Sequence, residues 1–364
     1  MFRGTHRAAG PDRPAVHHYT TRKKALMKVK RLSIYIQYFS CLAALAMTGC
    51  IDEDLSDCGA EMSVQYNVQL KLNLKSELYS ELTTAEEQQM AARLEESLSH
   101  VFTTQASGLD LSFFDAATSG IQRHETHEIN SNQASFTLYM TPNDYRHTAL
   151  AHTAGWGQLH ITSPDSHTAM KVEQEKGEII EGHSTGLFCG REEISVESGQ
   201  SRNFNVELHM QNAASVLVLH HSPAVSPTEI RTYICDMGVS FCPADSTFDL
   251  NNPPTIRTQN IEADKLTACY AVSFPSADEP AGHAMRSDDA AGNASIWRMV
   301  VLVTMPDGKT TKNTLYIRQP LKAGTLKVLK GHLDNHGELI TDEKDVGVSV
   351  QLDWESGGDH DIDM

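Results

Sequence analysis

The residues whose types and spacing predict chemistry are four consecutive positions, Met47, Thr48, Gly49 and Cys50. An apolar residue, two small residues and a cysteine form the pattern that bacterial signal peptidase II cleaves, because small residues are needed beside the scissile bond. We therefore expect cleavage between Gly49 and Cys50, followed by acylation of the Cys50 thiol and of its freed amine. Each buried methylene contributes about 0.8 kcal/mol, so several acyl chains anchor a protein stably, whereas one chain does not.

The segment before this site has the features of an export leader. Lys28, Lys30 and Arg31 form a basic start, and residues 32–47 form a mostly apolar run. That run is short for a membrane-spanning helix. A failed transmembrane helix, or an ordinary secretory signal with a chance cysteine, is the alternative to a lipidated Cys50.

Residues 1–49 are thus predicted to be a leader and lipoprotein signal peptide. The true start is expected at Met27, because residues 1–26 are polar and basic without an apolar period. Residues 50–60 are expected to form a lipidated acidic tether. The carboxylates of this tether are Asp52, Glu53, Asp54 and Asp57.

The charge of the chain excludes one class of partner. The formal net charge of the 364 residues is −17, and residues 1–49 hold nine of the 30 Lys and Arg but one of the 47 Asp and Glu. The remainder therefore carries about −25. Such a body would be repelled by phosphates, so no nucleic-acid partner is expected.

The cysteines that follow Cys50 do not form a complete disulfide set. They are Cys58, Cys189, Cys235, Cys242 and Cys269. An odd number cannot pair fully within one chain, and most are expected to be small buried hydrophobes. Cys235 and Cys242 are close in sequence, and whether they pair stays open.

Apolar residues alternate with polar ones along most of the chain, which predicts half-buried strands. The pattern is clear in "VQYNVQLKLNL" (64–74), and "FTLYM" (136–140) is followed by a "TPND" turn and a return strand. Three short strands are expected over residues 187–208. One helix is predicted after Thr84, where Thr84 and Glu87 form a capping box.

The strand pattern restarts near residue 213 with the unbroken apolar segment "ASVLVLH". The segment "IWRMVVLVTM-PDG-KTTKNTLYIRQ" (296–319) predicts a hairpin, and an alternating strand closes the chain before residue 355.

Many short strands, one clear helix and no alternation of strand and helix indicate an all-β fold of two tandem β-sandwiches. We predict an N-terminal sandwich over residues 61–211 and a C-terminal sandwich over residues 212–355. Residues 356–364 are expected to form a mobile acidic tail.

The order of several short motifs resembles the FimB-type fimbrial anchor-subunit lipoproteins of Bacteroidales, the fimbrillin-like proteins of type V pili. The motifs are the lipidation cysteine followed by "DLSDC", the first strand, "FTLYMTPNDYRHTALAH", "GLFCGREEISVESGQ" and "NAASVLVLH". They are spread over most of residues 50–354. Cys189 replaces the family's usual aromatic residue, and the second domain matches less well.

This resemblance implies two transthyretin-like β-sandwich domains and a lipid-anchored protein of the outer membrane. It implies fimbrial shaft subunits, or fimbrillins, as partners. It also implies that Asp52, Glu53 and Asp54 act as an export signal to the cell surface, whereas a plain solvated tether is the simpler interpretation of the same residues.

Three short motifs are similar to functional sites but lack the context that those sites need. Gly182 to Gly186 matches G-x-S-x-G, yet a strand rather than a helix is expected after Ser184. His124 and His127 lie in a segment that we expect to be a solvated loop, without a zinc-binding H-E-x-x-H pattern. No catalytic residue, metal ligand or cofactor site is therefore predicted.

Three functions remain after these observations. The first is an outer-membrane lipoprotein that anchors the base of a fimbrium at the cell surface, without catalysis; an influence on fimbrial length stays open. The second is a surface glycan-binding lipoprotein, which would need an exposed aromatic platform. Trp156, Trp297 and Trp354 are dispersed, and the last two are expected in the core. A lipid-anchored hydrolase is the third and is the least supported by motifs.

Overall fold

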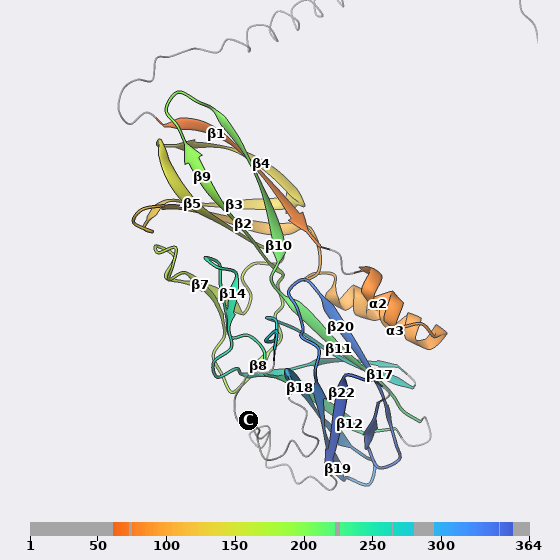
Figure 1. Cartoon of the computed structure of the whole chain (residues 1–364). Coiled ribbons are helices and arrows are strands. Elements are labelled where there is room, and N and C mark those ends of the chain that lie inside the picture. Colours follow the sequence, from red (N-terminus) through yellow and green to blue (C-terminus); the bar gives the residue numbers. More distant parts are fainter. Residues whose placement is uncertain are drawn as a thin grey trace, which may run out of the picture. The chain divides into compact units, whose positions relative to one another are not determined.

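The computed structural model describes residues 61–351 apart from 73–74, 223–225, 264, 280–294 and 342 (Figure 1). Several predictions fall outside the described residues. They concern the cleavage and lipidation site at Gly49 and Cys50, the export signal Asp52, Glu53 and Asp54, the start at Met27, and the tail 356–364.

Seven strands form the first sheet, in the order β3-β2-β5-β9-β10-β1-β4. Their bounds are β1 Met62–Lys71, β2 Ala106–Asp115, β3 Ile121–Ser131, β4 Gln133–Met140, β5 Asn143–His152, β9 Leu187–Val196 and β10 Arg202–Met210. In β1, every second residue is buried as the period-two pattern predicts, among them Val64, Tyr66 and Val68. The all-β fold class is confirmed. One continuous strand, β9, replaces two of the three short strands expected over residues 187–208.

The first sheet turns a corner where β9 and β10 meet. These strands pair at two positions only, one of which joins Phe188 to Met210. The layer β4-β1-β10 therefore faces the layer β3-β2-β5-β9. Tyr66 from one layer meets Phe113 from the other edge to face, with ring centroids 6.3 Å apart, and both are fully buried. The sheet is thus folded into a β-sandwich around its own core.

The prediction of a hairpin at the "TPND" turn is wrong. β4 pairs with β1, whereas β5 pairs with β2 and β9. The chain therefore crosses from one layer to the other after Met140. A turn signal predicts a change of direction, but the partner of each strand is decided by the apolar face that the strand must bury.

Two further sheets form a second sandwich. Their orders are β16-β17-β11-β20-β21 and β22-β19-β18-β12-β15-β8. The bounds are β8 Ile179–Glu181, β11 Ala213–His220, β12 Glu229–Cys235, β15 Thr255–Arg257, β16 Gln259–Ala263, β17 Leu266–Ser273, β18 Trp297–Thr304, β19 Thr310–Ile317, β20 Leu326–Leu333, β21 Leu339–Ile340 and β22 Val346–Gln351. Leu217 of β11 lies in one buried cluster with Met299 and Val301 of β18. The predicted β18–β19 hairpin is present, in full register from Trp297 to Thr304.

A smaller sheet connects the two halves of the chain. Its order is β14-β13-β7-β6, with bounds β6 Leu159–Thr162, β7 Lys171–Gln174, β13 Ser240–Cys242 and β14 Thr247–Asp249. β7 pairs with β13, and β8 pairs in parallel with β15. Strands β7 and β8, which precede residue 211 in the chain, therefore pair with strands that follow it. The chain changes sheets between Met210 and Ala213, but the division into domains 61–211 and 212–355 stays a prediction.

Two helices, α2 (Lys75–Glu81) and α3 (Ala85–Leu98), lie between β1 and β2 in sequence. The predicted capping box is present: the Glu87 backbone N–H donates to Thr84 Oγ1 over 3.2 Å, and the Thr84 N–H donates to Glu87 Oε2 over 2.9 Å. The sequence analysis missed α2, which has seven residues and too few turns to give a clear apolar period.

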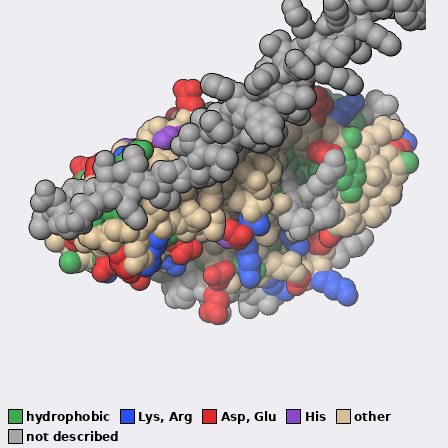
Figure 2. Space-filling view, turned by 90° about the horizontal axis from the view of Figure 1, so that it is seen from above, with side chains coloured by type: hydrophobic (Ala, Val, Ile, Leu, Met, Phe, Trp, Pro, Cys, Tyr) green, Lys and Arg blue, Asp and Glu red, His purple; other side chains and the backbone are tan. Residues whose placement is uncertain are grey.

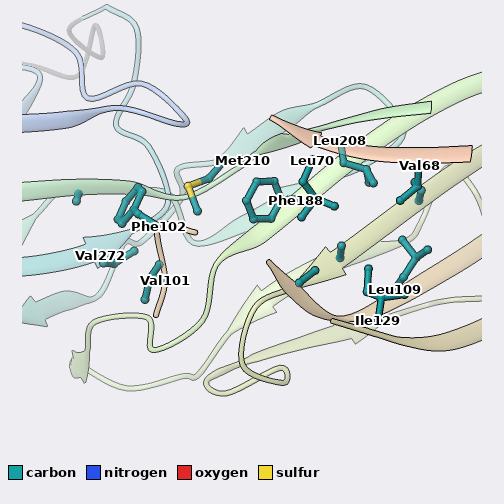
Figure 3. Packing of buried hydrophobic residues seen from close by; sticks show 14 of the residues in the cluster. Val68, Leu70, Val101, Phe102, Leu109, Ile129, Phe188, Leu208, Met210 and Val272 are labelled. Carbon is teal, nitrogen blue, oxygen red and sulfur yellow. The ribbon is translucent and has the colours of Figure 1, made fainter. Parts of the chain in front are cut away.

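Helix α3 covers the outer face of the sheet that contains β11 and β17 (Figure 1). Met90 and Leu94 of the helix share a buried cluster with Val218 of β11 and Tyr270 of β17. This explains why "ASVLVLH" is apolar without a break: β11 is buried on both faces. The same cluster extends into the first sandwich. In Figure 3, Val101, Phe102, Met210 and Val272 lie together where the two halves meet.

We expect Leu94→Ala to lower the free energy of unfolding by about 2–5 kcal/mol, because the truncation leaves a cavity between α3 and the sheet of the second half. Leu94 is fully buried. Urea denaturation followed by circular dichroism would measure the change. Gln89→Ala on the exposed side of α3 is the matched control and should alter stability by less than about 0.5 kcal/mol. Equal effects of the two substitutions would contradict this packing.

Candidate functional site

The strand that would connect a membrane anchor to the body is β1. Cys50 precedes its first residue, Met62, by twelve positions. β1 lies between two partners: it pairs in parallel with β10 over Val64–Lys71 and antiparallel with β4 over Met62–Gln69. Its backbone groups are therefore hydrogen-bonded on both sides along nearly its whole length.

Beneath β1 a buried hydrogen bond links the two layers of the first sandwich. The Tyr66 hydroxyl lies 2.5 Å from His147 Nε2, and His147 Nδ1 lies 2.9 Å from the carbonyl oxygen of Ser112. Since that carbonyl can only accept, Nδ1 carries the proton and Tyr66 donates to Nε2. The His147 ring stacks on Phe113, with ring centroids 4.2 Å apart. Burial lowers the pKa of His147 to about 3, although the bond to Ser112 acts in the opposite direction.

A second buried histidine joins the two halves of the chain. His183 Nε2 lies 2.9 Å from Gln174 Oε1, and the Asn212 side-chain amide lies 3.0 Å from His183 Nδ1. The Gln174 amide in turn donates to the carbonyl of Gly238. This order of donors fits a neutral ring protonated on Nε2, and burial lowers the pKa of His183 to about 3. The backbone N–H of His183 also donates to the Val272 carbonyl, over 2.8 Å.

Neither histidine is among the functional residues predicted from the sequence. In β5, His147 occupies a buried position in an alternating segment, and its polarity gave no sign that it faces the core. His183 lies inside the G-x-S-x-G match, where attention falls on the serine. Only the fold brings Tyr66 next to His147, and Asn212 next to His183.

Four cysteines of the described part of the chain are free thiols: Cys189, Cys235, Cys242 and Cys269. Cys235 and Cys242, whose pairing was open, thus do not form a disulfide. Burial raises the pKa of Cys189 and Cys269 to about 12 and that of Cys235 to about 11. These three thiols behave as the small buried hydrophobes that the sequence predicts.

Sheet edges are the places where another chain could add a strand. β3 is an edge strand whose side chains are largely charged and paired, for example His127 with Glu125 over 2.9 Å. β22 is different: it pairs with β19 on one side, and on its other side it has no strand partner among the described residues. It also exposes Val350 (38 %). β22 is therefore the more open edge of the two.

The segment that contains His124 and His127 is not a loop, contrary to our expectation; it forms β3. Residues three apart on a strand point to opposite faces, so these histidines cannot share a metal ion. Exposed and half-buried residues alternate along β3, but the sequence did not reveal this period because the strand contains few apolar residues. Ser184 is followed by strand β9, and its hydroxyl donates to Gln158 Oε1.

Among the described residues, which exclude the gaps within 61–351, no group of three or more His, Cys, Asp or Glu side chains is placed to hold a metal ion. No helix in that part of the chain is long and apolar enough to span a membrane.

No protein-family model matches the sequence, and no curated protein matches it. Several solved structures are similar. One is the fimbrial anchor protein Mfa2 of Porphyromonas gingivalis, with 10 % identity and a TM-score of 0.45, covering 80 % of this chain and 99 % of that one. A candidate adhesin of Bacteroides thetaiotaomicron has 12 % identity and a TM-score of 0.47, covering 81 % and 97 %.

A third similar structure is a candidate polysaccharide-binding protein of Bacteroides thetaiotaomicron, with 9 % identity and a TM-score of 0.43, covering 74 % of this chain and 91 % of that one. A fimbrial anchor is thus among the solved structures that the chain resembles, as the sequence motifs predicted. At identities this low, the assignment of a function rests on the residues of this chain itself.

We expect the protein to lose stability as the pH falls below about 6.5, because His147 and His183 must stay neutral in the fold. Their pKa values are about 3 when folded and near 6.5 when unfolded, so protons bind preferentially to the unfolded chain between these limits. Between pH 6.5 and 5, each histidine should reduce the free energy of unfolding with a slope that approaches about 1.4 kcal/mol per pH unit.

Urea titrations at several pH values would measure this slope. His147→Gln should lower the slope by up to about 1.4 kcal/mol per pH unit, whereas His100→Gln at an exposed position is the matched control and should change it less. A free energy of unfolding that is flat between pH 6.5 and 5 would contradict the neutral, buried state of both rings.

Proposed function

We propose that this protein is an outer-membrane lipoprotein that anchors the base of a fimbrium at the cell surface. The observation that carries the proposal is the position of β1. The predicted lipid on Cys50 is followed, after a short acidic segment, by a strand that is paired on both sides in the middle of a sandwich layer.

The geometry of β1 suits a strand under tension. A force applied along the strand from its N-terminal end loads the hydrogen bonds to β10 and β4 together, rather than one after another. Those bonds must then break in concert, so the strand resists sliding although each bond contributes only about 1 kcal/mol. The buried Tyr66–His147 bond adds a link from β1 to the opposite layer.

Fimbrial shaft subunits are the proposed partners, and main-chain pairing is the proposed contact. β22 offers an open edge at the C-terminal end of the described chain, with Val348 and Val346 packed against the second core and Val350 exposed. An added strand would extend the sheet β22-β19-β18. The tether charges Asp52, Glu53 and Asp54 would direct the protein to the outer face of the membrane.

The proposed role is structural and not catalytic. Ser184 lies before a strand, and the histidines of β3 point to opposite faces. The alternative of a surface glycan-binding lipoprotein finds little support in the tryptophans. Trp297 is fully buried, as expected, and the indole of Trp156 packs partly against a buried cluster.

Cys50→Ala should prevent lipidation, because the thiol that accepts the diacylglycerol is lost. Cells grown with a fatty-acid analogue should label the wild-type protein and not the variant, and the variant should appear unprocessed or in the medium. Cys58→Ala, eight positions away, is the matched control and should label like the wild type. Equal labelling of Cys50→Ala and wild type would refute the anchor site.

Deletion of the gene should release fimbriae into the medium while fimbrillin is still produced. A shaft whose base is not held by acyl chains has only adsorption to retain it. Electron microscopy of cells and of sedimented culture medium would measure attached and shed fimbriae. Attached fimbriae that are unchanged in number after deletion would rule out the anchoring role.

A further inference from the structure

A cavity of about 550 Å³ lies against the outer face of β5 and β9. Its lining comes from three parts of the chain: the two strands, the loop that contains His167 and Thr168, and the β13–β14 connection from Cys242 to Asp245. The volume is within the range of small-molecule sites. The anchoring proposed above gives this cavity no role.

Two arginines project into the cavity from neighbouring strands. Thr148 of β5 is paired with Arg191 of β9, and Arg146 is two residues from Thr148, so both guanidinium groups lie on one face. Arg146 donates to Ser119 Oγ over 3.1 Å, and Arg191 donates to the carbonyl of Ala244. Within the described part of the chain neither guanidinium forms an ion pair with a carboxylate. This is unusual in a chain of net charge −17.

The ring of His167 forms part of the wall of the same cavity. Its side chain is only 7 % exposed, and its ring meets Phe114 edge to face, with ring centroids 5.2 Å apart. Nδ1 is buried and has no hydrogen-bond partner. Burial lowers the pKa of His167, and Arg146 and Arg191 lower it further, which places both cations close to the ring. Since solvent does not reach Nδ1, the ring forms a wall of the cavity and a ligand there does not contact this nitrogen.

Carboxylates also line the cavity, which limits the ligands that fit. They belong to Glu192, Glu193 and Asp245. Asp245 Oδ1 already accepts bonds from the backbone and hydroxyl of Thr247. These carboxylates would repel a simple anion. A molecule that carries both an oxyanion and hydroxyl groups would not, because hydroxyls donate to carboxylates while the oxyanion meets the arginines.

We propose that this cavity binds a sugar acid. The carboxylate of the sugar lies between Arg146 and Arg191 and accepts from both guanidinium groups. The ring hydroxyls donate to the carboxylates of Glu193 and Asp245. Guanidinium groups pair with carboxylates through two parallel hydrogen bonds, which fixes the orientation of the ligand. The two arginines are then paired by the ligand rather than by the protein.

This binding is independent of the proposed anchoring. The cavity is formed by β5, β9 and the β13–β14 connection, whereas anchoring depends on Cys50 and β1. A protein with Cys50→Ala should therefore bind the ligand like the wild type, so either idea can fail while the other stands.

Isothermal titration calorimetry of the full chain in detergent would test the proposal with D-glucuronate, D-galacturonate and N-acetylneuraminate as probes. D-Glucose and inorganic phosphate are the comparison ligands. At least one sugar acid should bind at least tenfold more tightly than glucose, which lacks the carboxylate, and than phosphate, which lacks the ring hydroxyls. Arg146→Gln and Arg191→Gln should each weaken that binding at least tenfold.

Two further variants separate the parts of the site. Glu193→Gln should weaken the sugar acid severalfold and leave phosphate unchanged or bound more tightly. Arg93→Gln is the matched control: Arg93 is on α3, outside the cavity, and donates to the carbonyl of Glu262. It should leave every titration unchanged. Circular dichroism of each variant would confirm that it is folded.

Several outcomes would overturn the assignment. They are the absence of binding by all three sugar acids at millimolar concentration, equal binding of glucose, binding of phosphate alone, and sugar-acid binding that survives both arginine substitutions in folded protein.

Discussion

The placement of β1 between β10 and β4 is the constraint on which the rest of the structure depends. Because β1 pairs in parallel with β10, the chain between them must travel through both layers before it returns alongside its own first strand. That path includes the helices, the second layer of the first sandwich and the strands β6 to β8. The full set of hydrogen bonds of β1 forms only when residues 202–210 are also in place. Folding of the first sandwich is therefore governed by contacts that are distant in sequence.

The same path explains why the two halves are joined so extensively. Strands β7 and β8 leave the first sandwich and pair with β13 and β15, and α3 covers an apolar face of the second sandwich. The His183 hydrogen bonds to Gln174 and Asn212 lie at this joint. A neutral, fully buried imidazole can bridge an acceptor and a donor only in one tautomer. The joint thus depends on polar groups that must all be satisfied together as well as on apolar burial.

The sequence predicted the features that are set locally. The alternation in residues 64–70, the capping box of Thr84 and Glu87, and the β18–β19 hairpin all follow from neighbouring residues. It did not predict which strands lie side by side. β4 and β5 separate into two layers although a turn joins them, since strand pairing is decided by long-range burial. The cavity of Arg146, Arg191 and His167 was also not predictable, because its members are brought together only when the loop after β6 folds over β5 and β9.

The free energy that holds the lipid in the membrane and the free energy of folding together determine which part of such an anchor must resist force. Several acyl chains at about 0.8 kcal/mol per buried methylene hold the proposed lipid end with tens of kcal/mol. A folded domain is held by only about 5–15 kcal/mol. Under sustained pulling, the body would therefore yield before the lipid leaves the membrane, unless the direction of force opposes unfolding. A first strand at a sheet edge would peel away one bond at a time. A strand paired on both sides, with Tyr66 bound to the opposite layer through His147, must lose both ladders and a buried polar link at once.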